Sequence, residues 1–405
     1  MKQYNVIFKG YRRDCNKSTL PTYSEIYMVH RCVYHSRDIM QNNLPPHKDS
    51  AKSSDKFCRQ SGIEALRIVS MFLVLLVHAL FFSLGRPTHL DLENHSLEMI
   101  CRTELEAISL VCVNVFVLIS GWFGITVKWK GLFKFIYQWL FWALLISLFF
   151  AIAIGGVSFN EIRLLIGSYQ YYWFLYAYLF LYILSPVLNA FVESNSSGEV
   201  KKFLWLYWIF MFFFGWLEQL NYIQYGLSPI LFIGLYVTAR YIKRISPRWA
   251  NKSWTMDFCL YILFSTLSAC FMIAVVLFDK DVHYVDKAYG MFMSYVNPLT
   301  VVSSIYLLLA FSKFRFRSRI INRVAASAFA VYLLQCNYGI FEPYFKKYVV
   351  LIHDQFDGAT YPLVTLLYLK SIYLVAFFID QLRIFTFSKL IDYVKAFNNG
   401  RIKNS

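Results

Sequence analysis

The sequence predicts an all-α membrane protein, a polytopic bundle of about ten transmembrane helices. Three observations support this fold class. Of the 405 residues, 58% are hydrophobic and only 16% are charged, whereas a soluble domain of this size carries about a quarter charged residues. Aromatic residues make up 20% of the chain, which suits lipid-facing surfaces and interfacial belts. Apolar stretches of membrane-spanning length recur along most of the sequence.

Residues 1–60 differ from the rest of the chain. They are polar, rich in Lys and Arg and without sustained periodicity, and they lack the apolar core and cleavage site of a signal peptide. We therefore expect a disordered cytoplasmic extension. Met40 is a candidate internal start, and translation from it would omit most of this extension. A transmembrane domain over 61–390 and a short cytoplasmic tail over 391–405 follow.

Ten apolar segments make up the expected transmembrane domain. They cover about 66–84, 107–127, 132–154, 172–191, 203–217, 227–242, 258–278, 289–311, 324–342 and 363–384. The fifth and sixth are short for a complete span, which takes about 20 apolar residues. The ninth is weakly hydrophobic and begins with small residues that suit close helix packing. With ten spans, both termini lie on one side of the membrane.

Positive charge decides which side that is. One set of alternate loops, with the tail, holds most Lys and Arg of the domain: Lys128, Lys130, Lys134, Lys201, Lys202, Arg240, Lys243, Arg244, Arg248, Lys252, Lys313, Arg315, Arg317, Arg319, Arg323, Lys389, Lys395, Arg401 and Lys403. The other loops hold Arg86, Arg102, Arg163, Lys280, Lys287, Lys346 and Lys347. By the positive-inside rule the first set and both termini are cytoplasmic. The net charge of +16 therefore indicates a lipid bilayer as partner and no nucleic acid.

Arg67 and His78 lie near the two ends of the first apolar segment. They are eleven positions apart, which in an α-helix is three turns plus about 20° and a rise of about 16 Å. Both side chains therefore lie on one face. Ionisable groups are costly in a membrane helix and are by default functional candidates. With a cytoplasmic N-terminus, Arg67 belongs at the inner surface and His78 beyond the middle of the bilayer.

Each of these two residues has two interpretations. Neutral histidine can act as a general base, or it can be a structural side chain bonded to a neighbouring helix. No Asp or Glu lies within two turns of His78, so an orienting partner must come from another span, and Asn114 is one candidate. Arg67 either binds phosphate groups or reaches the headgroups and sets the topology.

Other polar groups give weaker signals. We expect Asp91, Glu93, Glu98, Glu104 and Glu106 to form a solvated acidic loop, with a lid or ligand contact as the alternative. Asp380 and Arg383 lie three residues apart on one helix face and could pair. The eight cysteines are scattered and lack metal-ligand spacing, so we expect neither a disulfide framework nor a metal site.

Around Arg67 and His78, and at several later motifs, the sequence resembles the acyltransferase 3 family. The matching motifs are Gly62–Arg67 followed by His78, Asn114–Gly121 with Trp122, Tyr172–Leu175 running into Leu184–Asn189, and Phe329–Leu334. The resemblance covers about 62–390. One departure is evident, because the late Tyr-Leu-Leu motif commonly ends in His in this family and here ends in Gln335. No role of that histidine carries over.

The resemblance implies that 61–390 is a transmembrane acyltransferase domain in the inner (plasma) membrane. It implies an O-acyltransferase that moves an acyl group, most simply acetyl, from cytoplasmic acyl-coenzyme A to a hydroxyl of a surface polysaccharide or lipid-linked glycan. The acyl-coenzyme A is a donor substrate, and we expect no permanently bound cofactor. The alternatives are a transporter or flippase of lipid-linked glycans, or a scaffold without chemistry.

The resemblance also assigns roles to individual residues. It makes His78 the catalytic base and Arg67 a catalytic and donor-binding cation. The loop lysines Lys128, Lys130 and Lys134 are further candidates for donor binding, although a positive-inside loop explains them as well. Candidates for substrate binding are Asn114, Ser120 and Trp173. Ser120 and Gly121 also suit plain helix packing, and Trp173 also suits an interfacial belt.

Overall fold

The computed structural model describes residues 60–154, 156, 158–278, 284–358 and 360–403. Within these ranges the chain forms helices joined by turns, with no strand. The all-α prediction is therefore confirmed. These residues belong to a unit that spans Arg59–Ser405. The expected cytoplasmic extension lies outside the described residues, apart from Gln60.

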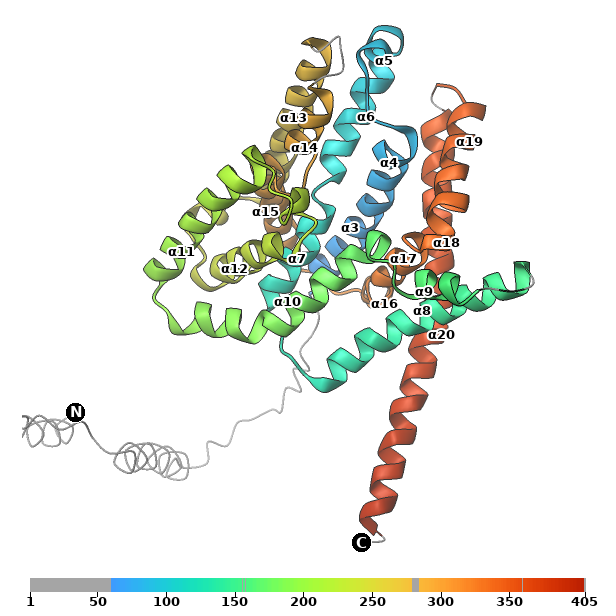
Figure 1. The fold of residues 1–405 in the computed structure, drawn as a ribbon. Helices are drawn as coiled ribbons and strands as arrows, with labels where there is room; N and C mark the ends of the chain where they lie inside the picture. The colour runs from blue at the N-terminus through green and yellow to red at the C-terminus, as the bar shows by residue number, and fades with distance from the viewer. Residues whose placement is uncertain (1–59, 155, 157, 279–283, 359, 404–405) are drawn as a thin grey trace, which may run out of the picture. The chain divides into compact units, whose positions relative to one another are not determined.

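In its described residues, the first half of this unit runs through the helical elements from α3 to η1 (Figure 1). They are α3 (Ser61–Ala79), α4 (Phe81–Leu84), α5 (His89–Asn94), α6 (Ser96–Ser109), α7 (Cys112–Phe123), α8 (Trp129–Ile154), α9 (Phe159–Gly167), α10 (Tyr169–Ser194), α11 (Ser197–Phe210) and the π-helix η1 (Met211–Leu217).

The second half begins at a short 3₁₀ turn and ends in a long helix. Its elements are η2 (Gln224–Gly226), α12 (Pro229–Ile245), η3 (Arg248–Ala250), α13 (Trp254–Phe278), α14 (Val285–Phe292), α15 (Pro298–Ser312), α16 (Arg319–Ala325), α17 (Ala328–Gln335), α18 (Tyr338–Ile340), the π-helix η4 (Phe341–Lys346), α19 (Lys347–Gln355) and α20 (Thr360–Lys403). The expected tail over 391–405 thus begins inside α20.

Seven helical stretches of the described chain are long and apolar enough to cross a membrane. They are Ser61–Leu84, Ser96–Phe123, Trp129–Ala153, Tyr169–Ser194, Ser197–Leu217, Trp254–Phe278 and Thr360–Val394. A bent pair, Arg319–Gln335 with Tyr338–Gln355, makes an eighth if it counts as one span. A membrane helix bundle is therefore confirmed, while ten complete spans are not.

The two remaining apolar segments form helices too short to cross alone. α12 has 17 residues and α15 has 15, whereas a complete span takes about 20. Proline explains where both begin, because Pro229 and Pro298 stand in the first helical turn, where their missing N–H is not needed. The Asn297 side chain caps α15 by accepting from the Leu299 N–H at 3.0 Å.

α3 and the α6–α7 stretch form the interior of the bundle (Figure 1). In the most apolar part of Ser96–Phe123, 72% of the residues are buried, and in Ser61–Leu84 the share is 56%. In the other five spans, only 22% to 33% of the residues in the most apolar part are buried. These spans expose apolar side chains where lipid would lie. The face shared by Arg67 and His78 is therefore on an inner helix.

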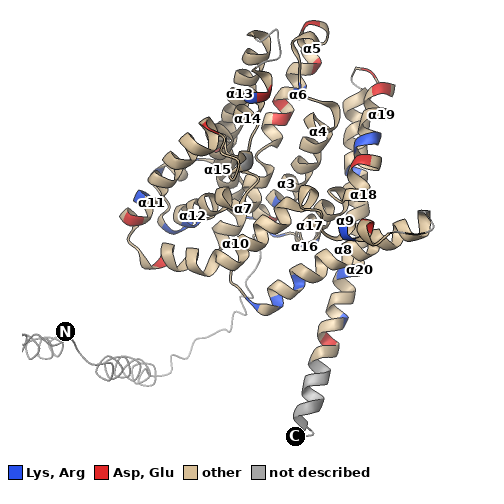
Figure 2. Cartoon of the chain, viewed as in Figure 1, with Lys and Arg blue, Asp and Glu red and all other residues tan. Residues whose placement is uncertain are grey.

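The acidic segment after the first span is helical. Asp91 and Glu93 lie on α5, while Glu98, Glu104 and Glu106 lie on α6. Glu106 is fully buried, and the Glu104 carboxylate accepts from the Thr266 hydroxyl of α13 at 2.5 Å. The prediction of a solvated loop is therefore wrong for these two side chains, because α6 continues into the buried α7. Figure 2 shows acidic residues near α5 and α19, and basic residues near the start of α8.

The late apolar segment is broken in the middle. Its two halves, α16–α17 and α18–α19, bend by 66° at Cys336 and Asn337. The buried Asn337 side chain satisfies a backbone group at the bend by accepting from the Gly339 N–H at 3.0 Å, and it ties the bend to α9 by donating to the Leu165 carbonyl at 2.8 Å. Irregular backbone at membrane depth is tolerated only where protein buries it or where it lines a cavity.

A buried ion pair holds α20 against α8. The Arg383 guanidinium binds the Asp380 carboxylate through Nε at 2.9 Å and Nη2 at 2.6 Å. This confirms the expected pairing. The Trp142 indole N–H of α8 donates to the same carboxylate at 3.2 Å. Because both charges are buried, removing either one would leave the other uncompensated.

Gly121 sets the distance between α7 and α12. A Cβ atom added to Gly121 would lie 2.5 Å from the Tyr236 carbonyl oxygen and 2.9 Å from the Ala239 Cβ. The Tyr236 carbonyl belongs to the helix backbone, so no side-chain rotation can make room for the added atom. Ser120 donates to the Phe116 carbonyl at 3.0 Å, as serines in packed helices do. Both contacts agree with a packing role for the Ser-Gly pair.

We therefore predict that Gly121→Ala destabilises the protein, because α12 must move away from α7. Overpacking of this kind costs about 1–3 kcal/mol. The measurement is thermal unfolding of the detergent-solubilised protein. Gly198→Ala is the matched control, since its added Cβ meets only the Ser196 hydroxyl oxygen at 3.9 Å. Equal melting temperatures of the two variants would contradict the packing role.

Candidate active site

His78 lies at the C-terminal end of α3, where two aromatic rings hold its imidazole. Phe82 and Phe341 contact the imidazole edge-on, with ring centroids at 5.4 and 5.5 Å and interplanar angles of 82° and 87°. The Ser83 hydroxyl donates to the His78 carbonyl at 2.6 Å, which ties down the helix end. The ring is half-buried, and its orientation is fixed by contacts from α3, its continuation α4, and η4.

The hydrogen-bond partner of His78 is on the broken helix. Nδ1 of His78 lies 2.8 Å from Oε1 of Gln335, the last residue of α17. The Cys336 sulfur lies 3.1 Å from the same oxygen and 3.8 Å from Nδ1. Gln335 and Cys336 are both buried. The bend in the late helix therefore brings an amide and a thiol to one edge of the imidazole.

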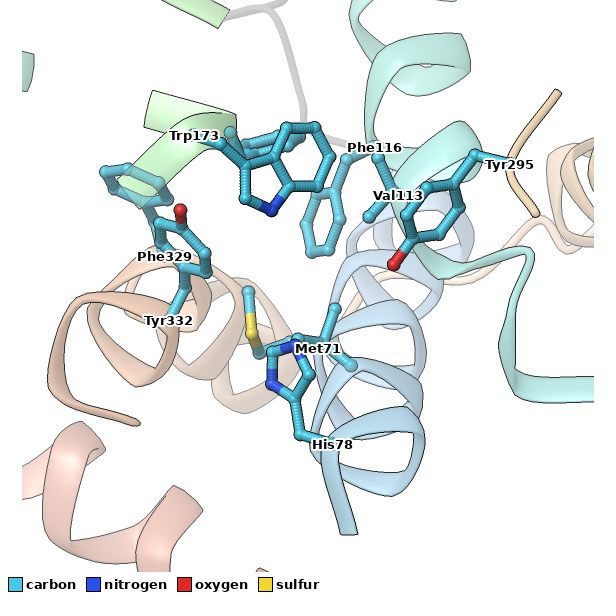
Figure 3. Close-up of a pocket in the computed structure, with 10 residues that line it drawn as sticks. Met71, His78, Val113, Phe116, Trp173, Tyr295, Phe329 and Tyr332 are labelled. Carbon is cyan, nitrogen blue, oxygen red and sulfur yellow. The ribbon is translucent and has the colours of Figure 1, made fainter. Parts of the chain in front are cut away.

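The other edge of the imidazole faces a small cavity (Figure 3). Its volume is about 40 Å³, space for about three water-sized groups. The lining residues come from four helices and one loop: Met71, Val74, His78, Val113, Phe116, Trp173, Phe174, Tyr295, Phe329 and Tyr332. Figure 3 shows the indole nitrogen of Trp173 and the Tyr295 hydroxyl turned toward the interior of this space.

The first helix leads from this cavity to Arg67. Met71 and Val74 line the cavity together with His78, and Arg67 is one turn before Met71 on the same face. Arg67 uses Nη1 to bind both oxygens of Glu64 at 2.9 Å, which leaves Nη2 and Nε outside that pair. Its guanidinium also lies 5.9 Å from the centre of the Phe123 ring at the end of α7.

More cations lie around the C-terminal end of α7. The Lys243 ammonium is 4.6 Å from the centre of the Trp122 ring. Arg240 lies against Gly124, since a Cβ added there would be 2.5 Å from its Nη1, and it forms an ion pair with Glu193. We call Arg67, Arg240 and Lys243 the basic cluster. In the sequence, Arg240 and Lys243 are recognisable only as loop charges, because no local pattern ties α12 to α7.

The three loop lysines follow the C-terminal end of α7 in the chain. Lys128 precedes α8, and Lys130 and Lys134 lie in its first turns. All three are exposed. The Tyr182 hydroxyl of α10 accepts from the Lys128 N–H and donates to its carbonyl, both at 3.1 Å, so the backbone at this point is anchored. The structure places their side chains at the surface, outside the cavity.

The three candidates for substrate binding occupy different places. Trp173 lines the cavity with His78. Asn114 is buried and donates to the Tyr295 carbonyl at 2.9 Å, so it positions a cavity residue and does not contact the imidazole. The Ser120 hydroxyl lies 3.0 Å from the Tyr178 hydroxyl and does not line the cavity. The orienting partner of His78 is Gln335, which in the sequence stands out only as a departure from a motif.

One known protein family matches this chain. A family model described as an acyltransferase domain, of the acyltransferase 3 type, matches residues 60–380. No curated protein and no solved structure matches the chain. The matched range includes the cavity, the basic cluster and the broken helix. In the described part of the chain, no group of three or more His, Cys, Asp or Glu side chains could hold a metal ion.

Proposed function

Because this chain belongs to the acyltransferase 3 family and is a membrane acyltransferase, we propose that it is an O-acyltransferase with acyl-coenzyme A as donor. The acyl group is most simply acetyl, and the acceptor is a hydroxyl of a surface polysaccharide or lipid-linked glycan. The observation that carries the proposal is the position of His78. Its imidazole is fixed by contacts on one edge and turned toward a cavity on the other.

The proposed reaction is a direct acyl transfer at this cavity. Nε2 of His78 takes the proton from the acceptor hydroxyl as its oxygen attacks the thioester carbonyl. The carbon–sulfur bond then breaks, and the imidazolium returns the proton to the departing thiolate. The products are an ester and free coenzyme A. The indole N–H of Trp173 and the hydroxyl of Tyr295 are donors that can stabilise the negative oxygen of the intermediate.

The basic cluster supports binding of the donor at the other end of α3. Coenzyme A carries several phosphate charges, and a planar guanidinium binds phosphate through paired hydrogen bonds. Arg67 lies about 16 Å along the helix from His78, a distance comparable to an extended pantetheine arm. Phosphates held by Arg67 and Lys243 would leave the thioester within reach of the cavity. The loop lysines Lys128, Lys130 and Lys134 add to the attraction for the anionic donor.

The charge distribution supports a cytoplasmic position of the basic cluster. Lys and Arg lie near the start of α8, Asp and Glu lie near α5, and α19 carries residues of both signs (Figure 2). This bias favours a donor from the cytoplasm under the positive-inside rule. It also favours an acceptor that enters from the outer side, in the inner (plasma) membrane. A transporter of lipid-linked glycans would not require a fixed histidine at the cavity.

The proposal predicts that His78→Ala and His78→Gln insert and fold but lose acyl transfer by about a hundredfold or more, the scale for loss of a general base. Glutamine keeps a hydrogen-bonding side chain yet takes no proton at neutral pH. The measurement is release of free thiol from acetyl-coenzyme A together with acylation of surface glycans. His95→Gln, at an exposed position, is the matched control. Near wild-type transfer by His78→Gln would remove His78 from the mechanism.

Donor binding is tested at the basic cluster. Arg67→Lys keeps one charge and loses the planar fork, and Lys243→Gln removes a charge. Loss of one hydrogen bond to a charged group costs about 1.5 kcal/mol or more, so the donor KM should rise about tenfold in each variant. Lys202→Gln, an exposed lysine at the start of α11, controls for net charge. A donor KM unchanged by Arg67→Lys would leave Arg67 as an anchor for topology.

A further inference from the structure

The contact between His78 and Gln335 has a direction that matters for catalysis. A neutral imidazole has one N–H and one bare nitrogen, and the partner of one nitrogen decides which is which. Nδ1 lies 2.8 Å from the amide oxygen of Gln335. An oxygen of an amide only accepts hydrogen bonds. Nδ1 therefore carries the proton in this arrangement, and Nε2 presents a bare lone pair.

We propose that Gln335 is a positioning residue, whose amide oxygen holds His78 with Nδ1 protonated so that Nε2 can accept a proton at the cavity. The proposal rests on the proposed acyl transfer, because it explains why the free edge of the ring is the basic one. Gln335 contacts His78 and does not line the cavity. It acts through the histidine.

In the structure the amide oxygen of Gln335, and not its nitrogen, faces Nδ1 of His78, and either orientation leaves one end of the buried amide without a partner in the described part of the chain. The Gln335 oxygen receives two donors, the His78 N–H and the Cys336 thiol at 3.1 Å. If the amide were reversed, its N–H groups would point at the weakly accepting Cys336 sulfur and at an Nδ1 without a proton. The amide oxygen would then lie where the nitrogen now lies. That nitrogen has no hydrogen-bond partner among the described residues. The reversed amide predicts the opposite tautomer, so the two arrangements differ in a measurable property.

The surrounding structure keeps the amide in place. Gln335 ends α17, and the backbone bends directly after it. Asn337 anchors the bend, because its side chain donates to the Leu165 carbonyl and to the Tyr172 hydroxyl, both at 2.8 Å. The imidazole on the other side is fixed by Phe82 and Phe341. Both partners of the hydrogen bond are therefore held before any substrate arrives.

A neutral partner has a different effect from a carboxylate. A carboxylate next to Nδ1 would hold the same tautomer and would also stabilise the imidazolium. Gln335 holds the tautomer without adding charge. Among the described residues, the titratable groups that face His78 are Cys336, directly after α17, and the cavity residues Tyr295 and Tyr332, and these are ordinarily neutral near pH 7. We therefore expect replacement of the amide by a carboxylate to change the pH dependence of the reaction.

The tautomer itself is measured by nitrogen NMR of the ¹⁵N-histidine-labelled full chain in lipid nanodiscs. Comparison with His78→Gln assigns the His78 signals. The proposal predicts a protonated Nδ1 and a bare Nε2 in the wild type, and a mixture of tautomers in Gln335→Met. A protonated Nε2 in the wild type would overturn the proposal. This readout does not depend on acyl transfer, so it stands even if the proposed function fails.

Kinetics supply the second test. Gln335→Met keeps the length of the side chain without the hydrogen bond, and kcat should fall about tenfold or more while the donor KM stays unchanged. Gln335→Glu should keep most of kcat and move the acidic limb of the pH–rate profile upward by about one pH unit. Gln381→Met is the matched control, because the Gln381 amide donates to the hydroxyl of Ser327 at 3.1 Å, at the opposite end of α17 from Gln335.

The outcomes separate the two proposals. Absence of acyl transfer by the wild type under all donor and acceptor conditions would count against the proposed function alone. If the wild type transfers acyl groups and Gln335→Met has the same kcat and the same pH profile, the role of Gln335 is overturned. A loss of kcat shared equally by Gln335→Met and Gln381→Met would also overturn it, because the effect would then be one of packing.

Discussion

The hydrogen bond between His78 and Gln335 connects the first described helix to the bend in the late one. It brings together residues 257 positions apart in the chain. The interior of a membrane bundle offers polar groups few partners, so each such bond restricts how the helices pack. The break after α17 is compatible with this environment because Asn337 satisfies the exposed backbone. The cavity then lies where α3, α7, α10 and α17 meet.

The two proposed roles, donor binding and acyl transfer, lie at opposite ends of α3. One end carries Arg67 in the basic cluster, and the other carries His78 at an apolar cavity. Phosphate recognition needs cations near water, whereas acyl transfer benefits from a dry site with fixed donors. α3 meets both requirements, because a rigid helix holds Arg67 and His78 about 16 Å apart. Its burial inside the bundle explains why its ionisable face is directed at protein.

Local periodicity predicted the features that depend on a single helix. The shared face of Arg67 and His78 and the pair of Asp380 with Arg383 both follow from 3.6 residues per turn. Contacts between helices did not follow. Asn114 was the candidate partner of His78, but its amide bonds to the Tyr295 backbone. Glu106 and Glu104 were expected in a loop, yet tertiary packing buries the first and pairs the second. Hydropathy predicted about ten spans, but only seven helices of the described chain, or eight with the bent pair, are long enough to cross, because α12 and α15 begin at prolines and the late helix bends before Asn337.

The most direct test of this account is a structure of the protein with a thioether analogue of acetyl-coenzyme A, determined by electron cryomicroscopy in nanodiscs. The account predicts phosphates at Arg67 and Lys243. It predicts the acyl carbon in the cavity, within about 6 Å of Nε2 of His78, which leaves room for one acceptor hydroxyl between them. An analogue bound at the end that carries α5 and α19, or with its acyl carbon outside the cavity, would contradict the central claim.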